Sequence, residues 1–301
     1  MHSLFKYGLA ICLLATLMIY GCDSTRMMTS PSKAKWEDLL DPKMTKWEKF
    51  IGVPHTTVRD LDGYEKSSDV HVGTPLGLGN DPKNVFTMIK ENGENVLRAS
   101  GEIYGGLTSK LDYENYHLQL QYRWAEKKWE PRLNKKRDAG LLYHCTGDHG
   151  AFWNVWMRCL EFQIQETDTG DFFALAGANA MGISHPTEDQ LNYVHDTNGE
   201  WLGIGEKYGN WACSKSAIHE LPNGEWNSID LYVVGDQAIH LVNGNLVNGI
   251  KDAHLFEDGN RVPLTKGKLQ LQSEGAEIYY KRVRIQTIKE FPSELKIAAA
   301  L

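Results

Sequence analysis

The sequence predicts an all-β fold, an antiparallel sandwich, on two observations. From residue 95 onward, segments with period-2 alternation or a β-rich composition recur along the chain. Asn-Gly, Asp-Gly and other glycine-containing pairs separate these segments, and helical patterns do not intervene. Many short strands without crossover helices are typical of antiparallel sheets packed face to face.

The first 21 residues have the features of a targeting segment. They carry a Lys near the start, an apolar run too short to span a bilayer, and Gly21 before Cys22. The Ile-Tyr-Gly-Cys ending resembles a bacterial lipoprotein box, which implies cleavage before Cys22 and lipidation of its sulfur. Residues 22–34 are then a flexible tether. We therefore expect a protein of the bacterial cell envelope, lipid-anchored in the periplasm or on the outer-membrane surface. A plain secretion signal or a short membrane anchor is the alternative.

Residues 35–290 are expected to form a single domain, and residues 291–301 a C-terminal tail with one short helix. The opening segments 35–52 and 75–89 are interpreted as edge pieces of the sheets. Residues 167–225 are rich in Gly, Asn, His and aromatic residues and show little period-2 order. Because long loops are uncommon unless they are functional, we expect a long loop insertion that walls a cleft.

Charge and cysteine content narrow the class of protein. The net charge is −7, and the densest basic run, residues 126–137, also contains acidic residues, so nucleic acid is not an expected partner. Cys145, Cys159 and Cys213 are an odd, widely spaced set. This spacing is neither a disulfide framework nor a zinc pattern, so buried thiols are expected, with a single disulfide as the alternative.

Polar residues alternate with apolar ones in each predicted central strand. Leu118, Phe162 and Leu271 are examples of the apolar half, which we assign to the core. The polar positions that we expect on one shared surface are Gln119, Gln121, Arg123, His144, Glu161, Gln163, Gln165, Asp230, His240, Gln270, Gln272 and Glu274. Amides and carboxylates in fixed directions suit a hydroxyl-rich ligand, and Trp156 nearby offers a ring to stack on a sugar. The alternative is an ordinary solvated sheet face.

Three stretches carry a family resemblance. They are "RDAGLLYHCTGDHGAFWNVWMRCLEFQIQETDTGDFFALAG", "GEWNSIDLYVVGDQAIHLVNGNLVN" and "PLTKGKLQLQSEGAEIYYKRVRI". Together they resemble the 3-keto-disaccharide hydrolase family, formerly a domain of unknown function, over roughly residues 36–287. The resemblance implies a concanavalin-like jelly roll of two curved antiparallel sheets with a carbohydrate site on the concave face.

The implied fold is also similar to that of laminarinase-type family 16 glycoside hydrolases, whose catalytic strand reads E-x-D-x-x-E. Glu161, Gln163 and Glu166 occupy that spacing here. The resemblance implies a β-bulge that turns Glu166 inward. However, Gln163 stands where that pattern has Asp, and a neutral amide cannot share a proton with a neighbouring carboxylate. This departure argues against direct displacement at the anomeric carbon by two carboxylates.

The 3-keto-disaccharide hydrolase resemblance implies a different reaction. A ketone at C3 of the sugar acidifies the proton on C2, so the leaving group at C1 departs by elimination and water then adds across the double bond. Such a route needs a base near C2, stabilisation of the enolate and an acid for the leaving oxygen. The assignments it implies are Glu161 or His144 as base, Glu166 or Glu274 as acid, and Arg123 as enolate stabiliser. A divalent cation, Ca²⁺ or Mn²⁺, held by His144 and Glu161 is the alternative stabiliser.

The remaining expected site residues bind the substrate hydroxyls or rings: Gln121, Gln163, Gln165, Trp156, His240, Gln270 and Gln272. For His144, His240 and Glu274 a structural role is the alternative: a sheet-edge histidine, a solvated strand residue and an ion-pair partner of Lys268 or Arg123. The expected function is an exported lipoprotein enzyme that cleaves 3-keto-glycosides. A non-catalytic carbohydrate-binding lipoprotein and a conventional glycoside hydrolase are the alternatives.

Overall fold

The computed structural model describes residues 35–188 and 192–301, and nearly all of the regular structure in them is β-strand. Ala34–Leu301 form one unit. The predicted signal segment 1–21 and the tether 22–34, with the lipidation site Cys22, lie outside the described residues. Neither helix in the described ranges has the length and apolar character that crossing a bilayer requires.

One of the two sheets, which we call the front sheet, is antiparallel throughout. Its strands lie in the order β3 (Gly77–Leu78), β2 (Trp47–Ile51), β6 (Gly105–Ser109), β19 (Lys268–Ser273), β8 (Asp138–Thr146), β9 (Arg158–Gln165), β10 (Phe172–Leu175) and β14 (Ala212–Ser214). Strands distant in sequence, such as β19 and β8, are thus neighbours, which is what a jelly-roll connectivity produces.

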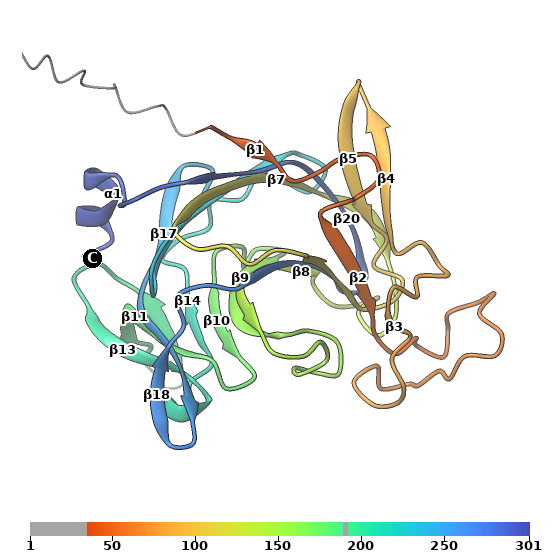
Figure 1. The fold of residues 1–301 in the computed structure, drawn as a ribbon, viewed down its shortest axis with the longest axis horizontal. Coiled ribbons are helices and arrows are strands. Elements are labelled where there is room, and N and C mark those ends of the chain that lie inside the picture. The colour runs from red at the N-terminus through yellow and green to blue at the C-terminus, as the bar shows by residue number, and fades with distance from the viewer. Residues whose placement is uncertain (1–34, 189–191) are drawn as a thin grey trace, which may run out of the picture. The chain divides into compact units, whose positions relative to one another are not determined.

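The other sheet, the back sheet, is also antiparallel. Its order is β4 (Phe86–Glu91), β5 (Glu94–Ala99), β20 (Ala276–Thr287), β7 (Tyr116–Lys128), β15 (Asn227–Val234), β16 (Gln237–Val242), β17 (Asn245–Glu257), β11 (Asn179–Pro186) and β13 (Glu200–Gly205). Figure 1 shows β7 and β20 arching over β8 and β9 of the front sheet.

Three short strands complete the two sheets. β1 (Glu37–Asp38) pairs with β20, and β18 (Asn260–Pro263) forms a hairpin with β17. β12 (Tyr193–His195) pairs antiparallel with β11 and parallel with β14, so it joins the back sheet to the front sheet. The helical elements are η1 (Glu206–Tyr208) and α1 (Ser293–Ala298), the short C-terminal helix that the sequence predicts.

The core lies between the two sheets. Leu118 and Leu120 of β7 belong to the same buried cluster as Phe162 of β9 and Leu271 of β19. These positions alternate with polar ones, as expected for strands with one buried face. The predicted jelly-roll sandwich is confirmed, and so are the core assignments of these strands. The three described cysteines, Cys145, Cys159 and Cys213, are buried and unpaired.

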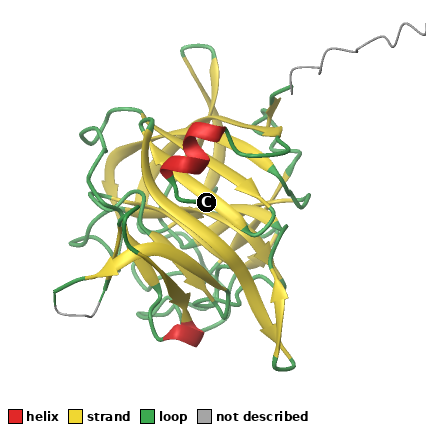
Figure 2. Ribbon diagram, turned by 90° about the vertical axis from the view of Figure 1, so that its left-hand side faces the viewer, coloured by secondary structure: helices red, strands yellow, loops and turns green. Residues whose placement is uncertain are grey.

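Strand β16 has the opposite orientation to the one predicted. His240 is fully buried in the core, where its ring stacks on Phe162 at 4.1 Å and contacts Tyr143 Oη at 3.0 Å. Its neighbours Ile239 and Leu241 face away from the core and are covered by the segment that carries α1 (Figure 2). The alternation along β16 is present, but both faces of this strand are buried. Because the α1 segment covers the outer face, the larger apolar residues lie there.

The predicted long loop at residues 167–225 is wrong, although Phe173, Leu175 and Trp211 of this region do line a pocket, as expected for a wall of the cleft. This region contains β10, β11, β12, β13, β14 and η1. Small buried residues such as Ala180 and Gly182 pack in it, so large apolar side chains do not alternate and the period-2 signal is weak.

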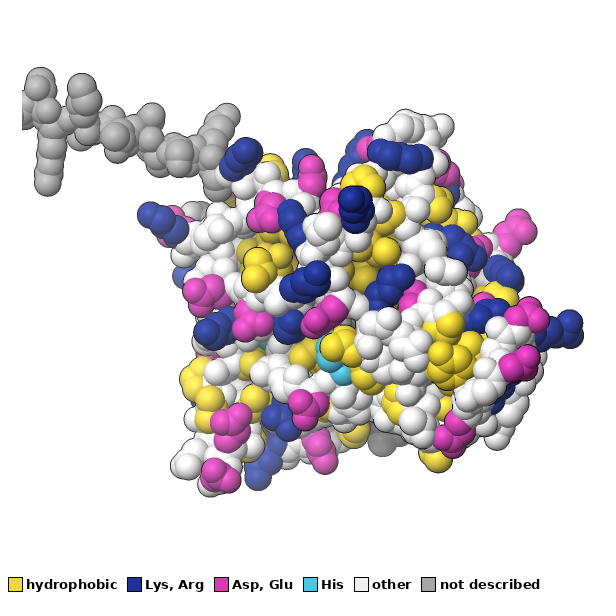
Figure 3. All heavy atoms as spheres, turned by 45° about the vertical axis from the view of Figure 1, so that its right-hand side comes forward, with side chains coloured by type: hydrophobic (Ala, Val, Ile, Leu, Met, Phe, Trp, Pro, Cys, Tyr) yellow, Lys and Arg dark blue, Asp and Glu magenta, His cyan; other side chains and the backbone are white. Residues whose placement is uncertain are grey.

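On the face of the molecule drawn in Figure 3, acidic and basic side chains are interspersed.

Candidate active site

Three adjacent strands of the front sheet align polar side chains on the face opposite the core. Glu161, Gln163 and Gln165 alternate along β9, and the register places them opposite Leu142, Gly140 and Asp138 of β8. β19 continues the rows, because Gln270 pairs with Leu142 and Glu274 bridges to Asp138. The carboxyl and amide groups of three strands therefore meet on one surface.

A glycine in the middle of this surface makes room for the longest side chains. A Cβ atom at Gly140 would collide with Oε1 of Glu161 and with Oε1 of Gln272. Gly106 of β6 has the same role next to β19, because a Cβ there would collide with the Gln270 amide of that strand. Glu161 and Gln272 thus lie over the backbone of β8 from opposite sides.

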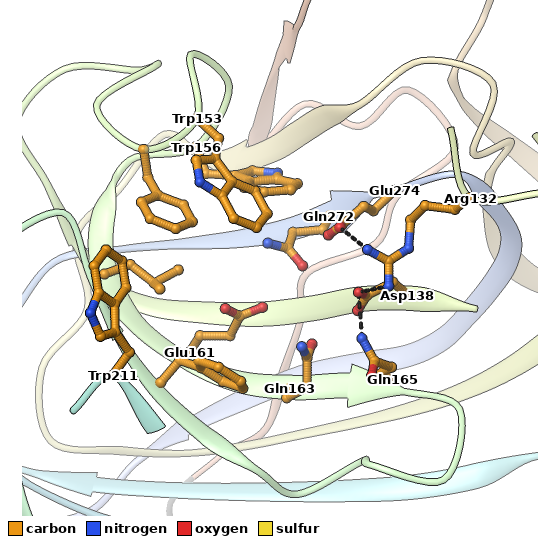
Figure 4. Close-up of a pocket in the computed structure, with 13 residues that line it drawn as sticks. Arg132, Asp138, Trp153, Trp156, Glu161, Gln163, Gln165, Trp211, Gln272 and Glu274 are labelled. Carbon is orange, nitrogen blue, oxygen red and sulfur yellow. Dashed lines mark hydrogen bonds and ion pairs between the residues drawn. The ribbon is translucent and has the colours of Figure 1, made fainter. Parts of the chain in front are cut away.

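A pocket of about 260 Å³ lies above these rows, and we call it the central pocket. Its lining residues are Arg132, Asp138, Phe152, Trp153, Trp156, Glu161, Gln163, Gln165, Phe173, Leu175, Trp211, Gln272 and Glu274. Figure 4 shows Trp153, Trp156 and Trp211 at one end, Arg132, Asp138 and Glu274 at the other, and Glu161 between them. An apolar wall facing directional polar groups is the usual composition of a small-ligand site.

Arg132 neutralises the polar end of the central pocket. Its guanidinium pairs with Asp138 and, at 3.0 Å, with Glu274. Burial raises the pKa of Asp138 to about 7, against the opposing charge of Arg132 and a hydrogen bond from Gln165. Burial also raises the pKa of Glu274, to which the charge of Asp138 adds. Glu274 therefore retains a proton to higher pH than an exposed glutamate.

Glu161 lies between the two ends and is buried, with 5% of its surface exposed. Burial raises its pKa well above the ordinary value, and the negative charge of Asp138 adds to this effect. A hydrogen bond from Gln272 opposes the shift. A carboxylate with little solvation is a stronger base than one in water, so Glu161 suits proton transfer.

Several buried polar atoms around the central pocket are unpaired. Arg132 Nε, Asp138 Oδ1 and Gln272 Oε1 have no hydrogen-bond partner among the described residues. Leaving a buried polar group unpaired costs about 1–3 kcal/mol, so such groups usually mark places where a ligand or water binds. Their positions fit a ligand with several hydroxyl or carbonyl groups.

The structure separates the predicted site residues into two groups. Glu161, Gln163, Gln165, Trp156, Gln272 and Glu274 line the central pocket. Gln270 lies just beside it, fully buried and bound to Thr108 Oγ1 at 2.7 Å, so it supports the rows from below. The partner of Glu274 is Arg132, a residue that none of the sequence-based alternatives named.

The prediction of one shared surface is wrong for the residues of β7, β15 and β16, because these strands belong to the back sheet. Arg123 pairs with Glu91 at 2.9 Å and lies over the Trp226 ring, away from the central pocket. Gln119 and Gln121 line a separate hollow of the back sheet together with Asp230. His240 is in the core.

His144 does not reach the central pocket either. Strict alternation would place it on the same face as Leu142, but β8 has an irregular register between Tyr143 and Thr146, and His144 has a φ of +52°. This bulge turns the imidazole away, towards the backbone of Gly235 in the turn between β15 and β16. Burial lowers the pKa of His144 to about 4.

Glu166 lies outside the central pocket because β9 ends at Gln165, before the position where a bulge was expected. Its carboxylate pairs with Arg137 at 3.1 Å and accepts a hydrogen bond from Asn223 at 2.5 Å. Burial raises the pKa of Glu166, but these contacts outweigh it, so the pKa lies below its usual range.

The expected metal site at His144 and Glu161 is not formed by these side chains, since only Glu161 lines the central pocket. The described residues contain no cluster of three or more His, Cys, Asp or Glu side chains that could hold a metal ion. The residues present at the polar end, Arg132 with Asp138 and Glu274, form an ion-pair network that involves a guanidinium.

Sequence reasoning missed Asp138, Arg132 and Phe173. Asp138 was detectable, because it lies two and four residues before Gly140 and Leu142 in the segment "DAGLLYH" and therefore points to the same face of the strand. Arg132 carried no such signal, since it lies in the β7–β8 loop and only the fold brings it over β19. Phe173 enters the wall through the pairing of β10 with β9 opposite Glu161.

The jelly-roll fold and the central pocket, together with the family match given next, support a carbohydrate-active enzyme or a carbohydrate binder. The chain belongs to the 3-keto-alpha-glucoside-1,2-lyase-like domain family, whose profile matches residues 35–286. No match to a functionally curated protein was found.

Three solved structures to which the chain is similar were compared. LamAcat from Zobellia galactanivorans is 12% identical, with 84% of this chain and 96% of that chain covered and a TM-score of 0.42. The alginate lyase AlyC3 is 13% identical, with coverages of 80% and 89% and a TM-score of 0.44. The carbohydrate-binding module CBM66 from Bacillus subtilis is 10% identical, with coverages of 67% and 92% and a TM-score of 0.40.

The buried His144 makes folding stability pH-dependent. An unfolded histidine binds a proton near pH 6.5, whereas His144 in the fold does so only near pH 4. The free energy of unfolding therefore has its full value, as far as His144 is concerned, above pH 6.5. It decreases by about 3 kcal/mol as the pH falls from 6.5 to 4, because the unfolded state binds the proton first. In urea unfolding at pH 7 and pH 4, the variant His144→Gln should lose less stability than the wild type. The exposed control His185→Gln should match the wild type, and parallel losses in all three proteins would contradict the assignment.

Proposed function

We propose that this protein is an enzyme that cleaves 3-keto-glycosides by elimination and hydration. The observation that carries the proposal is Glu161, a buried carboxyl group in the middle of the central pocket, in a chain of the 3-keto-alpha-glucoside-1,2-lyase-like family. Glu161 has an aromatic wall on one side and a guanidinium with two carboxyl groups on the other. A sugar ring held between these ends would present its carbon-bound hydrogens to Glu161.

In the first step, Glu161 takes the proton from C2 of the sugar, and the electron pair of that C–H bond forms an enolate with the C3 carbonyl. The enolate then collapses: the C3 carbonyl re-forms, a double bond forms between C1 and C2, and the bond from C1 to the leaving oxygen breaks. The leaving oxygen takes up a proton. Water finally adds across the double bond, with its OH on C1 and its H on C2, and the net reaction is hydrolysis.

Arg132 takes the role that the sequence gave to Arg123. It is a partly buried cation at the polar end of the central pocket, where it can stabilise the enolate oxygen. Glu274 is the acid candidate that lines this pocket, and the shift that keeps it protonated suits donation to the leaving oxygen. Gln163 and Gln272 are placed to bind hydroxyl groups, and Trp156 to pack on the ring.

The direct test is turnover of a 3-keto-glycoside by the purified protein in D₂O, followed by NMR. The expected result is release of the aglycone with solvent deuterium at C2 of the sugar product, because hydration delivers that hydrogen from solvent. Binding without turnover would leave a carbohydrate-binding protein. Cleavage of ordinary glycosides without deuterium at C2 would identify a conventional glycoside hydrolase.

Replacing the proposed base tests its role. Glu161→Gln keeps the shape of the side chain but removes the acceptor of the proton, so kcat should fall by about 10²–10⁴-fold. In the wild type, kcat/KM should increase with pH as Glu161 loses its proton, and decrease again where Glu274 loses its own. The control is Glu166→Gln, which changes a carboxylate outside the pocket and should leave turnover close to wild type. A fully active Glu161→Gln enzyme would remove Glu161 from the mechanism.

Gly140 offers a test of positioning. Gly140→Ala adds a methyl group where Glu161 and Gln272 now lie, so both side chains must shift. A misplacement of this size should lower kcat/KM by about 10- to 100-fold. The matched control is Gly182→Ala in β11, where the nearest atoms to a new Cβ are 3.5 Å away and no clash arises. Equal activity of both variants would show that Gly140 does not position the site.

We further propose that the protein is exported and lipid-anchored through Cys22, which lies outside the described residues. The supporting observation is the apolar N-terminal segment that ends in Gly21-Cys22. In the full chain, Cys22→Ser should move the protein from the detergent-soluble membrane fraction to the soluble fraction of the cell envelope. A variant that stays in the membrane would exclude Cys22 as the anchor.

A further inference from the structure

A second polar surface lies on the back sheet, on the face that turns away from the front sheet. Gln119 and Gln121 of β7 alternate with the core residues Leu118 and Leu120, so their side chains point outward. In Figure 1 this face lies above β7 and β20, on the side away from β8 and β9. A hollow of about 190 Å³ opens on it, and we call it the outer hollow. Its polar lining residues are Gln119, Gln121, Ser228, Asp230, Arg282 and Arg284.

The register of three neighbouring strands arranges the polar side chains of this face in rows. β7 lies between β15 and β20, and both pairings are antiparallel. The two rows at the outer hollow are Asp230–Gln119–Arg284 and Ser228–Gln121–Lys281. Each row thus leads from an oxygen-bearing side chain on β15, across an amide, to a cation on β20. Amide groups form the floor, and the basic groups lie along one side.

A β-bulge in β20 adds a cation to that side. The pairing of β20 with β7 is irregular between Lys281 and Arg284, and Arg282 has a φ of +51°. Because of the extra residue, Lys281 and Arg282 both face outward, and Val283 returns to the core. Bulges of this kind re-aim side chains and are frequent next to functional sites. The bulge therefore brings the Arg282 guanidinium to the outer hollow beside that of Arg284.

The charges of the outer hollow are unequally compensated. Asp230 Oδ1 accepts a hydrogen bond from Gln119 Nε2 at 2.6 Å, and Arg282 pairs with Glu94 at 2.9 Å. Arg284 has no carboxylate partner among the residues that the structure describes. Its Nε and Nη2 donate to Gln119 Oε1, at 3.0 and 2.6 Å, and the N–H groups of Nη1 remain unused. A guanidinium with unused donors and no acidic partner is a site for a planar anion such as a carboxylate.

The outer hollow also offers groups for hydroxyls. The side-chain amide of Gln121 has no hydrogen-bond partner in the described ranges, so its donor and its acceptor are both available. The bonds to Asp230 from Gln119 and from His117 Nε2, at 2.6 and 2.7 Å, both use Oδ1, which leaves Oδ2 for a ligand. Because a hydroxyl group donates and accepts, it can satisfy an amide and a carboxylate oxygen alike.

Aromatic rings flank the outer hollow on two sides. On one side, Trp36 contacts the His117 ring at 4.9 Å and lies 4.5 Å from the Arg284 guanidinium. On the other, the Arg123 guanidinium holds the Trp226 ring at 4.7 Å. The span of β7 from His117 to Arg123 is about 20 Å. Rings on both sides of a polar floor of this length are suited to pack on the sugars of a short oligosaccharide.

We propose that the outer hollow binds an oligosaccharide that contains a uronic acid. The carboxylate of the uronic acid pairs with Arg284, and sugar hydroxyl groups bind Gln121 and Asp230. Trp36 and Trp226 pack on the rings on the two sides. The site does not depend on the reaction proposed above, because none of its residues lines the central pocket.

The combination of groups distinguishes an acidic sugar from simpler ligands. A neutral sugar would leave the charge of Arg284 without a partner. An acidic ligand without sugar rings would leave the Trp36 and Trp226 rings unused and would not satisfy the Gln121 amide with hydroxyl groups. Only a ligand that carries both a carboxylate and hydroxyl-bearing rings uses the whole lining.

The position of the outer hollow gives this binding a consequence. Both sheets turn their polar rows away from the shared core, so the outer hollow and the central pocket lie on opposite faces of the sandwich. A saccharide in the outer hollow therefore leaves the central pocket open. An acidic polysaccharide bound there would hold the protein in place while the central pocket takes a separate, smaller ligand.

The test is isothermal titration calorimetry of the purified protein with three probes: tri-galacturonate, its methyl ester and tri-glutamate. The wild type should bind tri-galacturonate at least about tenfold more tightly than either other probe, because it alone combines carboxylates with sugar rings. Its affinity should decrease with added salt, since ion pairs near the surface are screened.

Two variants locate the binding. Arg284→Gln should weaken tri-galacturonate binding by about tenfold or more, the loss of a charge-assisted hydrogen bond. Gln121→Ala should weaken it by about fivefold, and it removes no side-chain hydrogen bond within the described part of the fold. The matched control is Arg261→Gln, which removes the same charge from β18, outside the outer hollow. Arg261→Gln and the central-pocket variant Glu161→Gln should both bind tri-galacturonate as the wild type does.

The absence of tri-galacturonate binding in the wild type would overturn the proposal, and so would equal affinity for the methyl ester or for tri-glutamate. Unchanged affinity in Gln121→Ala and Arg284→Gln would do the same. If Arg284→Gln does not fold, Gln121→Ala alone decides. A loss of binding in Glu161→Gln would place the ligand in the central pocket instead. Because the titration measures binding alone, its outcome is separate from whether the protein turns over a 3-keto-glycoside.

Discussion

The packing of the two sheets is the constraint on which the site depends. Phe162 and Leu271 are fully buried against the back sheet, and each such side chain contributes about 1.5–3 kcal/mol. Because side chains alternate along a strand, burying these residues directs Glu161 and Gln272 to the opposite face. A slip of one residue would exchange the two faces, so the same interaction that stabilises the fold also fixes the direction of the carboxyl and amide groups.

The electrostatics of the central pocket follow from that packing. Burial raises the pKa of Glu161 and of Glu274, and the rows bring Asp138 close enough to both that its charge raises the two pKa values further. Such a cluster is stable because Arg132 pairs with two of the three and because desolvated carboxyl groups can keep a proton. In the reaction that we propose, the same arrangement supplies a base and an acid in one groove.

Alternation predicted from sequence was reliable within the regular part of each strand, but it did not show which strands share a surface. Gln121 and Gln163 have equivalent patterns in their strands, but one lies on the back sheet and the other in the pocket. The pattern contains no information about which sheet a strand joins, since that depends on pairings between distant segments. It also fails at irregularities: the bulge at His144 is a local change of φ that the residue types around it do not signal.

By itself, the sequence determined the fold class, the parity of the residues in each central strand, and Glu161 among amides as the candidate centre. These are local properties, because a two-residue repeat is set by the geometry of one strand. Only the tertiary structure decided that Arg132 pairs with Asp138 and Glu274 at the centre and that His240 belongs to the core. These features arise where loops and strands that are far apart in the chain come into contact. The free energy of packing the whole sandwich determines which of these contacts form.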